Sequence, residues 1–318
     1  MRAQALHNRW ASGRAVEKAA SANHPLSLLV VQLLFGLFPV ASKKVLPYLD
    51  PFPLLAVRLT GAAFCLLVLH LLLVRNPIPI RKEWKAVFGL SLLGVVLNMG
   101  LFMVGLQLTT AVNAVVVITT VPVFTYSLAV LLRRETLAPR RAIGIAIALA
   151  GVLYLLAAGY RFNPAGALGD LLVLLNSLSY SAFLVFARPM TQRYDPLSLT
   201  TWMFLVGTIV FLPIGLALGL RGDLAAAPSE TMGWLLFIVL GASVLTYVLS
   251  NKVLRHVPAS TVAIFTYVQP VFTAIASYLI LDAHLDAKVI PAALLIFAGV
   301  WLVARKAPKV LEGQTVVD

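Results

Sequence analysis

The sequence predicts an all-α polytopic membrane protein with ten transmembrane helices, arranged as two inverted-topology repeats of five helices each. The first observation is composition, because 60% of the 318 residues are hydrophobic and only 12% are charged, against roughly 45–50% and 25% in soluble domains. The second is that the charges are clustered and leave apolar runs of about twenty residues, the length of helix that crosses a ~30 Å hydrocarbon core. The third is that the second half of the chain repeats motifs of the first half.

Apolar runs between charges and turn residues define the ten expected spans. They cover roughly residues 26–45, 53–74, 86–107, 112–132, 142–158, 169–187, 199–218, 233–254, 260–281 and 289–304. The expected organisation is a basic tail over residues 1–25, a first repeat over 26–158, an inverted second repeat over 159–304 and a C-terminal tail over 305–318. The first tail is not expected to be a signal peptide, because the apolar run after it is too long.

The distribution of charge predicts how the spans are oriented. If both termini are cytoplasmic, nineteen of the 25 Lys and Arg residues lie on the cytoplasmic side, five lie outside and Arg58 lies within a span, while the twelve acidic residues divide equally. Basic residues concentrate in cytoplasmic loops. The net charge of +13 therefore indicates a multi-pass protein of the inner (cytoplasmic) membrane with the lipid bilayer as its partner, and nucleic acid is not expected to bind.

The internal repeat predicts the relation between the halves. Residues 121–125 recur as residues 269–273, 148 positions later, and residues 48–51 resemble residues 193–196, 145 positions later. Because each half holds five spans, an odd number, the second half must enter the membrane upside down. Inverted repeats are typical of secondary transporters, whose substrate site lies near the membrane midplane between the halves.

Polar residues at helical spacing within the spans predict a substrate-binding cavity. In the eighth span, five polar residues from Ser243 to Asn251 follow one helix face, and such a face turns toward the bundle interior or a watery cavity. The candidate binding residues are Asn98, Asn176, Tyr180, Thr246, Tyr247, Ser250, Asn251, Thr266, Gln269 and Thr273. The alternative for each is an interhelical hydrogen bond, worth ~0.6 kcal/mol on average.

The repeat also predicts that the cavity is two-sided. Positions in the third span that match the polar face of the eighth are Val95, Asn98, Met99, Phe102 and Met103. One wall is thus expected to be polar and the other mainly apolar. Such a cavity suits an amphiphilic organic molecule better than a bare ion.

Three further residues are candidates for gating. Pro122 and Pro270 occupy equivalent mid-span positions, where proline removes a backbone donor and kinks a helix; the kinks are either hinges or static packing features. Arg58 lies well within the second span. It is expected either to snorkel to the outer interface or to bind an anionic group and close the outer gate.

Other features limit the choice of function. No carboxylate lies centrally in a span, so proton coupling of the usual kind is not visible. Cys65 has no metal-spaced neighbour, and no cofactor or metal is expected. Gly144, Ala148 and Gly151 are spaced either for close helix packing or for the face of a homodimer.

Two other classes of function are not favoured by the sequence. An integral-membrane enzyme would need converging catalytic groups, and a sensor or scaffold would usually add a soluble domain. The short loops offer neither.

Five motifs in register resemble the EamA type within the drug/metabolite transporter superfamily. They are Leu34-Phe35-Gly36, Val57-Arg58-Leu59, Arg134-Glu135-Thr136-Leu137, Pro258-Ala259-Ser260 and Tyr267-Val268-Gln269-Pro270-Val271-Phe272. Two positions depart from the family pattern. Phe35 replaces a common Trp, and the acidic residue that would repeat Glu135 in the second half is shifted or lost, since Ala283 occupies its place with Asp282 beside it. The resemblance implies alternating access around a central cavity. The expected function is export of small amino-acid-like, zwitterionic or neutral metabolites; the alternatives are efflux of drugs and a non-transporting sensor or scaffold.

Overall fold

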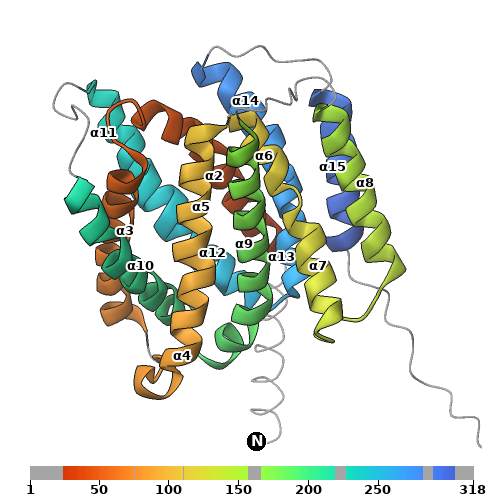
Figure 1. Ribbon diagram of the computed structural model, residues 1–318. Coiled ribbons are helices and arrows are strands. Elements are labelled where there is room, and N and C mark those ends of the chain that lie inside the picture. Colours follow the sequence, from red (N-terminus) through yellow and green to blue (C-terminus); the bar gives the residue numbers. More distant parts are fainter. Residues whose placement is uncertain are drawn as a thin grey trace, which may run out of the picture.

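The computed structural model describes residues 24–74, 76–109, 111–156, 166–218, 227–281 and 289–304. Every regular element in these ranges is a helix (Figure 1). Seven helical stretches are long and apolar enough to cross a membrane, at His24–Val45 (α2), Pro51–Leu73 (α3), Ile80–Leu108, Ala167–Arg193 (α9), Pro196–Leu218 (α10), Ser229–Leu254 and Ala259–Leu281. The expected tails lie outside the described residues, except that α2 already begins at His24.

The other three expected spans are shorter or interrupted. The fourth is divided into α6 (Ala111–Ile118) and α7 (Val121–Leu131), and the fifth and tenth correspond to α8 (Pro139–Leu156) and α15 (Val289–Ala304). The all-helical membrane architecture is confirmed. The count of ten spans stays a prediction, because only the seven stretches above are long and apolar enough among the described residues, while α7 and α15 are apolar but shorter.

Equivalent spans of the two halves share their local irregularities. Helices α3 and α10 both contain 23 residues. The third and eighth spans each pass through a π-helical segment, and the fourth and ninth are each interrupted. The third span comprises α4 (Ile80–Ser91), η1 (Leu92–Leu97) and α5 (Asn98–Leu108), and the eighth comprises α11 (Ser229–Leu236), η3 (Phe237–Leu245) and α12 (Thr246–Leu254). The ninth comprises α13 (Ala259–Ile264), the 3₁₀ segment η4 (Phe265–Val268) and α14 (Gln269–Leu281).

Equivalent helices also pack against each other in antiparallel orientation. The start of α3 meets the end of α10, where a Cβ on Gly215 would lie 2.5 Å from the Cβ of Ala56. The end of α3 meets the start of α10, where Thr201 Oγ1 donates a hydrogen bond to the Leu66 carbonyl at 3.3 Å. Antiparallel pairing of equivalent helices is what an inverted duplication requires.

The small residues of α8 allow α8 and α15 to pack closely at one edge of the bundle (Figure 1). A Cβ on Gly144 would lie 2.9 Å from the Gly299 carbonyl, and one on Gly151 would lie 2.9 Å from the Ala292 carbonyl. Ala148 is fully buried on the same face. The stripe that the sequence assigns to close packing or to a dimer face is thus covered by α15 of the same chain.

Replacing Gly299 with Val is expected to destabilise the protein by about 1–3 kcal/mol, the usual cost of overpacking. The new Cβ would lie 2.5 Å from the Gly144 carbonyl oxygen and 2.6 Å from the Ala148 amide nitrogen, and neither backbone can move aside cheaply. Thermal unfolding in detergent measures the effect. Gly89→Ala is the matched control, because a Cβ at Gly89 would meet nothing within 4 Å; equal losses in both variants would contradict the packing argument.

Apart from Arg58, the described Lys, Arg, Asp and Glu side chains lie at the two ends of the bundle. The basic end carries eleven of them, Arg81, Lys82, Lys85, Arg133, Arg134, Arg140, Arg141, Arg188, Arg193, Lys252 and Arg255, with three acidic residues. Arg193 at the end of α9 lies 3.4 Å from Glu83 near the start of α4 at this end. The opposite end carries Lys43 and Lys44 with three acidic residues. This asymmetry agrees with a single orientation in the membrane.

Glu135 joins the two halves at the basic end. Its carboxylate accepts hydrogen bonds from the backbone N–H and hydroxyl of Ser260, at the start of α13, and pairs with Arg141 at 2.6 Å. The Glu135 side chain is only 5% exposed. At the opposite end, the Thr109 hydroxyl donates to Asp170 at 2.7 Å. Each end therefore has at least one polar contact between the first half, residues 24–156, and the second half, residues 166–304.

Candidate functional site

A cavity lies between the two halves in the interior of the bundle. The first half contributes Phe35, Phe38, Pro39, Arg58, Asn98, Met99, Phe102, Ile118 and Val121, and the second half contributes Asn176, Tyr180, Tyr247, Thr266 and Gln269. The space that the centre of a water-sized sphere can reach measures about 70 Å³. One water needs ~10–15 Å³ by this measure, so the cavity has room for a small metabolite rather than a large one.

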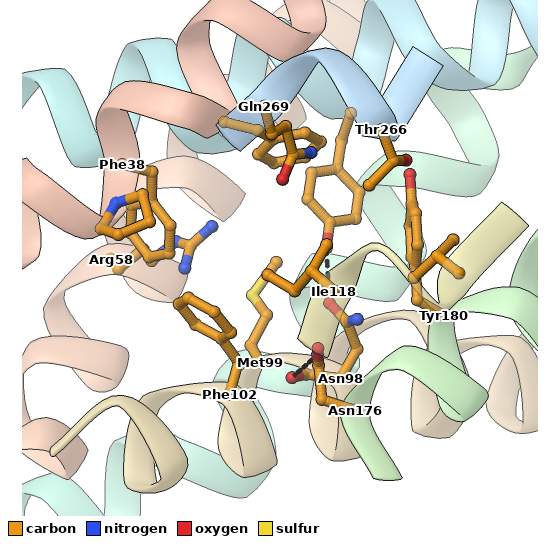
Figure 2. Close-up of a pocket in the computed structure, with 14 residues that line it drawn as sticks. Phe38, Arg58, Asn98, Met99, Phe102, Ile118, Asn176, Tyr180, Thr266 and Gln269 are labelled. Carbon is orange, nitrogen blue, oxygen red and sulfur yellow. Dashed lines mark hydrogen bonds between the residues drawn. The ribbon is translucent and has the colours of Figure 1, made fainter. Parts of the chain in front are cut away.

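The two walls of the cavity differ in chemistry. All five lining residues of the second half are polar, whereas seven of the nine from the first half are apolar. Figure 2 shows Phe38 and Phe102 on one side and Tyr180 and Thr266 on the other. Four apolar lining residues have a polar lining residue at the equivalent position of the other half. These pairs are Phe35 and Tyr180, Met99 and Tyr247, Ile118 and Thr266, and Val121 and Gln269. The cavity is amphipathic because the two halves differ at these positions.

Arg58 carries a positive charge at the edge of this cavity. It extends from α3, is 2% exposed, and donates from Nε to the Ser243 hydroxyl at 2.7 Å and from Nη2 to the Ala242 carbonyl at 3.2 Å. Its guanidinium carbon lies 4.2 Å from the centre of the Phe38 ring. The prediction that Arg58 snorkels to the interface is therefore wrong, because α11–η3–α12 covers it and offers two acceptors. Among the described residues, no carboxylate pairs with it.

Amides and a tyrosine form a hydrogen-bonded group on the polar side. The Tyr247 hydroxyl lies 3.1 Å from both the Gly94 carbonyl and Asn98 Oδ1. Asn176 donates to the Asn98 carbonyl at 2.6 Å (Figure 2). Gln269 donates to Gln32 of α2 at 2.6 Å, and both glutamines are buried. The sequence analysis did not select Gln32, although a glutamine within a span was a usable signal.

The π-helical segments supply carbonyl groups to this site. Gly94 lies in η1 and accepts from Tyr247, while Ala242 lies in η3 and accepts from Arg58. A π segment shifts hydrogen bonding from i−4 to i−5 and is frequent at functional sites. In both halves this local widening therefore presents backbone acceptors to side chains of neighbouring helices.

The two prolines mark the interruptions of the fourth and ninth spans. Pro122 is the second residue of α7 and follows the break at residues 119–120, while Pro270 is the second residue of α14 and follows η4. Neither proline lines the cavity, but Ile118 and Thr266, four residues before them, both do. Both spans are interrupted just before their prolines, where the sequence predicts kinks. The action of the prolines as hinges stays a prediction.

Four of the ten candidate binding residues lie outside the cavity lining. Thr246 donates to the Ala242 carbonyl of its own helix, and Ser250 lies beside Tyr180. Asn251 donates to Thr200 of α10 at 2.9 Å, and Thr273 donates to the Gly36 carbonyl of α2 at 2.7 Å. For Asn251 and Thr273 these contacts are the interhelical hydrogen bonds that the sequence left as the alternative. The other six, together with Arg58, line one cavity.

Replacing Thr273 with Val is expected to lower stability by about 0.6 kcal/mol, the mean value of an interhelical hydrogen bond in a membrane, and to leave substrate affinity unchanged. The substitution keeps the shape of a side chain that supports α2 without lining the cavity. Gln269→Leu is the comparison, since Gln269 lines the cavity one turn earlier. A larger loss of affinity in Thr273→Val than in Gln269→Leu would contradict this placement.

Comparison with known proteins identifies relatives along nearly the whole chain. A transporter from Archaeoglobus fulgidus, described as uncharacterized, is 30% identical over 288 residues, which cover 90% of this chain and 98% of the relative. Two uncharacterized transporters from Bacillus subtilis, YcxC and YyaM, are 29% and 26% identical, over 86% and 80% of this chain and 90% and 86% of their own lengths.

A solved crystal structure shares the fold with a TM-score of 0.71 at 18% identity, over 88% of this chain and 96% of that one. The model of the EamA-like transporter family matches the chain twice, at residues 25–157 and 167–305. These two matches coincide with the halves whose equivalent helices pack antiparallel. With one family repeat in each half and a cavity between them, the chain belongs to the EamA-like transporter family.

Proposed function

We propose that this protein is a secondary transporter of small amino-acid-like metabolites, zwitterionic or neutral, across the cytoplasmic membrane. The observation that carries the proposal is Arg58, a buried cation that faces an amphipathic cavity without a carboxylate partner among the described residues. A buried charge without a partner is costly, and a substrate carboxylate would supply a partner with charge-assisted hydrogen bonds. One cation suits one carboxylate; a phosphate ester would favour several basic groups.

The remaining lining groups suit the other parts of such a substrate. An ammonium group can be bound by carbonyl and hydroxyl oxygens such as those of Asn98 and Tyr247, and by the faces of aromatic rings. An apolar side chain can pack against Phe35, Met99 and Phe102. The small volume of the cavity favours a metabolite of this kind over a bulky drug.

The antiparallel halves support alternating access as the mechanism. In this scheme the two halves rock against each other, the interruptions at Pro122 and Pro270 act as hinges, and the cavity opens to one side at a time. The basic end is the cytoplasmic end, where Lys and Arg concentrate, so both termini are cytoplasmic. Export is the direction that the resemblance to the drug/metabolite superfamily favours.

Transport into liposomes that contain the purified protein tests the proposal. The substrates are labelled leucine, leucinamide, which lacks the carboxylate, and a bulky cationic dye, each offered with and without an imposed pH gradient. Uptake of leucine in preference to leucinamide is expected. Uptake of the dye alone would replace the proposal with drug efflux, and uptake of none of them by folded, inserted protein would contradict it.

A further inference from the structure

A second hollow lies at the basic end, outside the central cavity. Its volume is about 230 Å³, roughly three times the volume of the central cavity measured in the same way. Arg134 and Glu135 line it from the first half, and Arg188 and Gln192 line it from the second half at the end of α9. The hollow therefore spans the junction between the halves.

Two guanidinium groups are held in place at this hollow by backbone contacts. Arg134 donates from Nη1 to the Val185 carbonyl at 3.0 Å and lies over the ring of Phe186, with 5.1 Å from its guanidinium carbon to the ring centre. Arg188 donates from Nε to the Val257 carbonyl at 3.0 Å. Each of these hydrogen bonds uses one of the five N–H donors of an arginine. The anchors fix both groups at the wall and cancel none of their charge.

The one acidic side chain in the lining is already engaged. Glu135 accepts from Ser260 and pairs with Arg141 at 2.6 Å. Its negative charge is thus matched by Arg141 rather than by Arg134 or Arg188. The balance of the described charged groups at the hollow is positive, with three arginines against one carboxylate.

We infer that this hollow binds a phosphate-bearing anion between Arg134 and Arg188. Arginine presents paired N–H donors that match the geometry of phosphate oxygens. The orientation proposed above places the basic end at the cytoplasmic face, and basic pockets between membrane helices on that face bind lipid headgroups. An anionic lipid headgroup and free phosphate share this chemistry. By contacting both halves, the bound anion holds the basic end closed.

Thermal unfolding of the full-length protein in nanodiscs tests the site. The probes are phosphatidylglycerol mixed into phosphatidylcholine, and inorganic phosphate added to nanodiscs of phosphatidylcholine alone. A rise in unfolding temperature with phosphatidylglycerol but not with phosphate identifies a lipid headgroup as the ligand, whereas a rise with phosphate identifies the free anion. No rise with either probe would overturn the inference.

Variants separate this site from general surface charge. The double variant Arg134→Gln, Arg188→Gln is expected to weaken the response by about tenfold or more in probe concentration, because charge-assisted hydrogen bonds are lost. Arg81→Gln with Lys82→Gln is the matched control, since it removes the same charge from exposed positions at the same end. Equal responses in the two double variants would overturn the site.

A less disruptive pair of variants tests the site if the double variant fails to fold. Gln192 is exposed at the rim of the hollow, so Gln192→Glu keeps both arginines and adds a repelling charge, while Gln192→Ala adds none. Gln192→Glu is expected to weaken the response to the probe severalfold relative to Gln192→Ala. Indistinguishable responses would likewise contradict an anion in this hollow.

Discussion

Replacing Arg58 with Met is expected to reduce leucine transport by at least about a hundredfold, because a charge-assisted contact worth ~3 kcal/mol is lost. Stability is expected to change little. Ser243 would still donate to the Ile238 carbonyl, and the Ala242 carbonyl would still accept from Thr246, so no buried polar group loses all of its partners. Replacing a buried charge that lacks a counterion by an apolar side chain also removes the cost of keeping that charge away from water.

The separation of transport from stability distinguishes a substrate contact from a structural one. Transport into liposomes and thermal unfolding of the same preparations measure the two quantities. Arg58→Lys, which keeps the charge but loses the planar pair of donors, is expected to retain part of the transport and part of the preference for leucine over leucinamide. Transport by Arg58→Met at the native rate, or loss of transport together with unfolding, would contradict the assignment of Arg58 to the substrate.

A conservative change at the anchor of Arg58 serves as the control. Ser243→Ala removes the acceptor of the Arg58 Nε hydrogen bond but keeps the charge in the cavity. A modest loss of affinity is expected, since Ala242 and the Phe38 ring still hold the guanidinium. The order of transport should therefore be native, Ser243→Ala, Arg58→Lys and Arg58→Met.

The sequence predicts the repeat architecture well because the repeated residues include prolines, which determine where a helix is interrupted. Pro122 and Pro270 are 148 positions apart, and each follows an interruption of its span. The π-helical segments η1 and η3 were not predicted, although they too lie at equivalent positions. No residue type forces a π segment in the way that proline forces a break, so its position depends on packing between helices.

The candidate site could be predicted in part for a related reason. Helical spacing identifies which face of a span turns inward, and that face was correctly identified for Tyr247 as well as for Asn251, since both are buried. It does not identify which neighbour the face meets. Tyr247 meets the cavity, whereas Asn251, four residues later on the same face, meets Thr200 of α10. The burial of Arg58 could not be predicted for the same reason, because the helix that buries it, which includes Ala242, lies 184 residues further along the chain.

Replacing Glu135 with Ala is expected to open the basic end and to destabilise the protein by about 1.5–3 kcal/mol, the value of hydrogen bonds to a charged group. The variant leaves Arg141 without its carboxylate and frees the start of α13, whose Ser260 N–H and hydroxyl both donate to Glu135. Ala129, which is 1% exposed beneath this contact, should become accessible. Alkylation of Ala129→Cys by a membrane-impermeant maleimide, with Cys65 replaced by Ala, measures the opening.

The rate of alkylation should rise by about tenfold or more in Glu135→Ala, because ~1.4 kcal/mol of lost closure already changes the population tenfold. Glu230→Ala is the matched control, since it removes the same charge at the opposite end from an exposed pair with Lys44, and exposed pairs contribute little. Glu135 is expected to act as a latch that favours closure of the basic end. In the second half Ala283 occupies the position equivalent to Glu135 and Asp282 stands beside it, so the carboxylate is not repeated in register. If alkylation is unchanged in Glu135→Ala, or rises equally in Glu230→Ala, Glu135 holds α13 in place without controlling which end of the protein is closed.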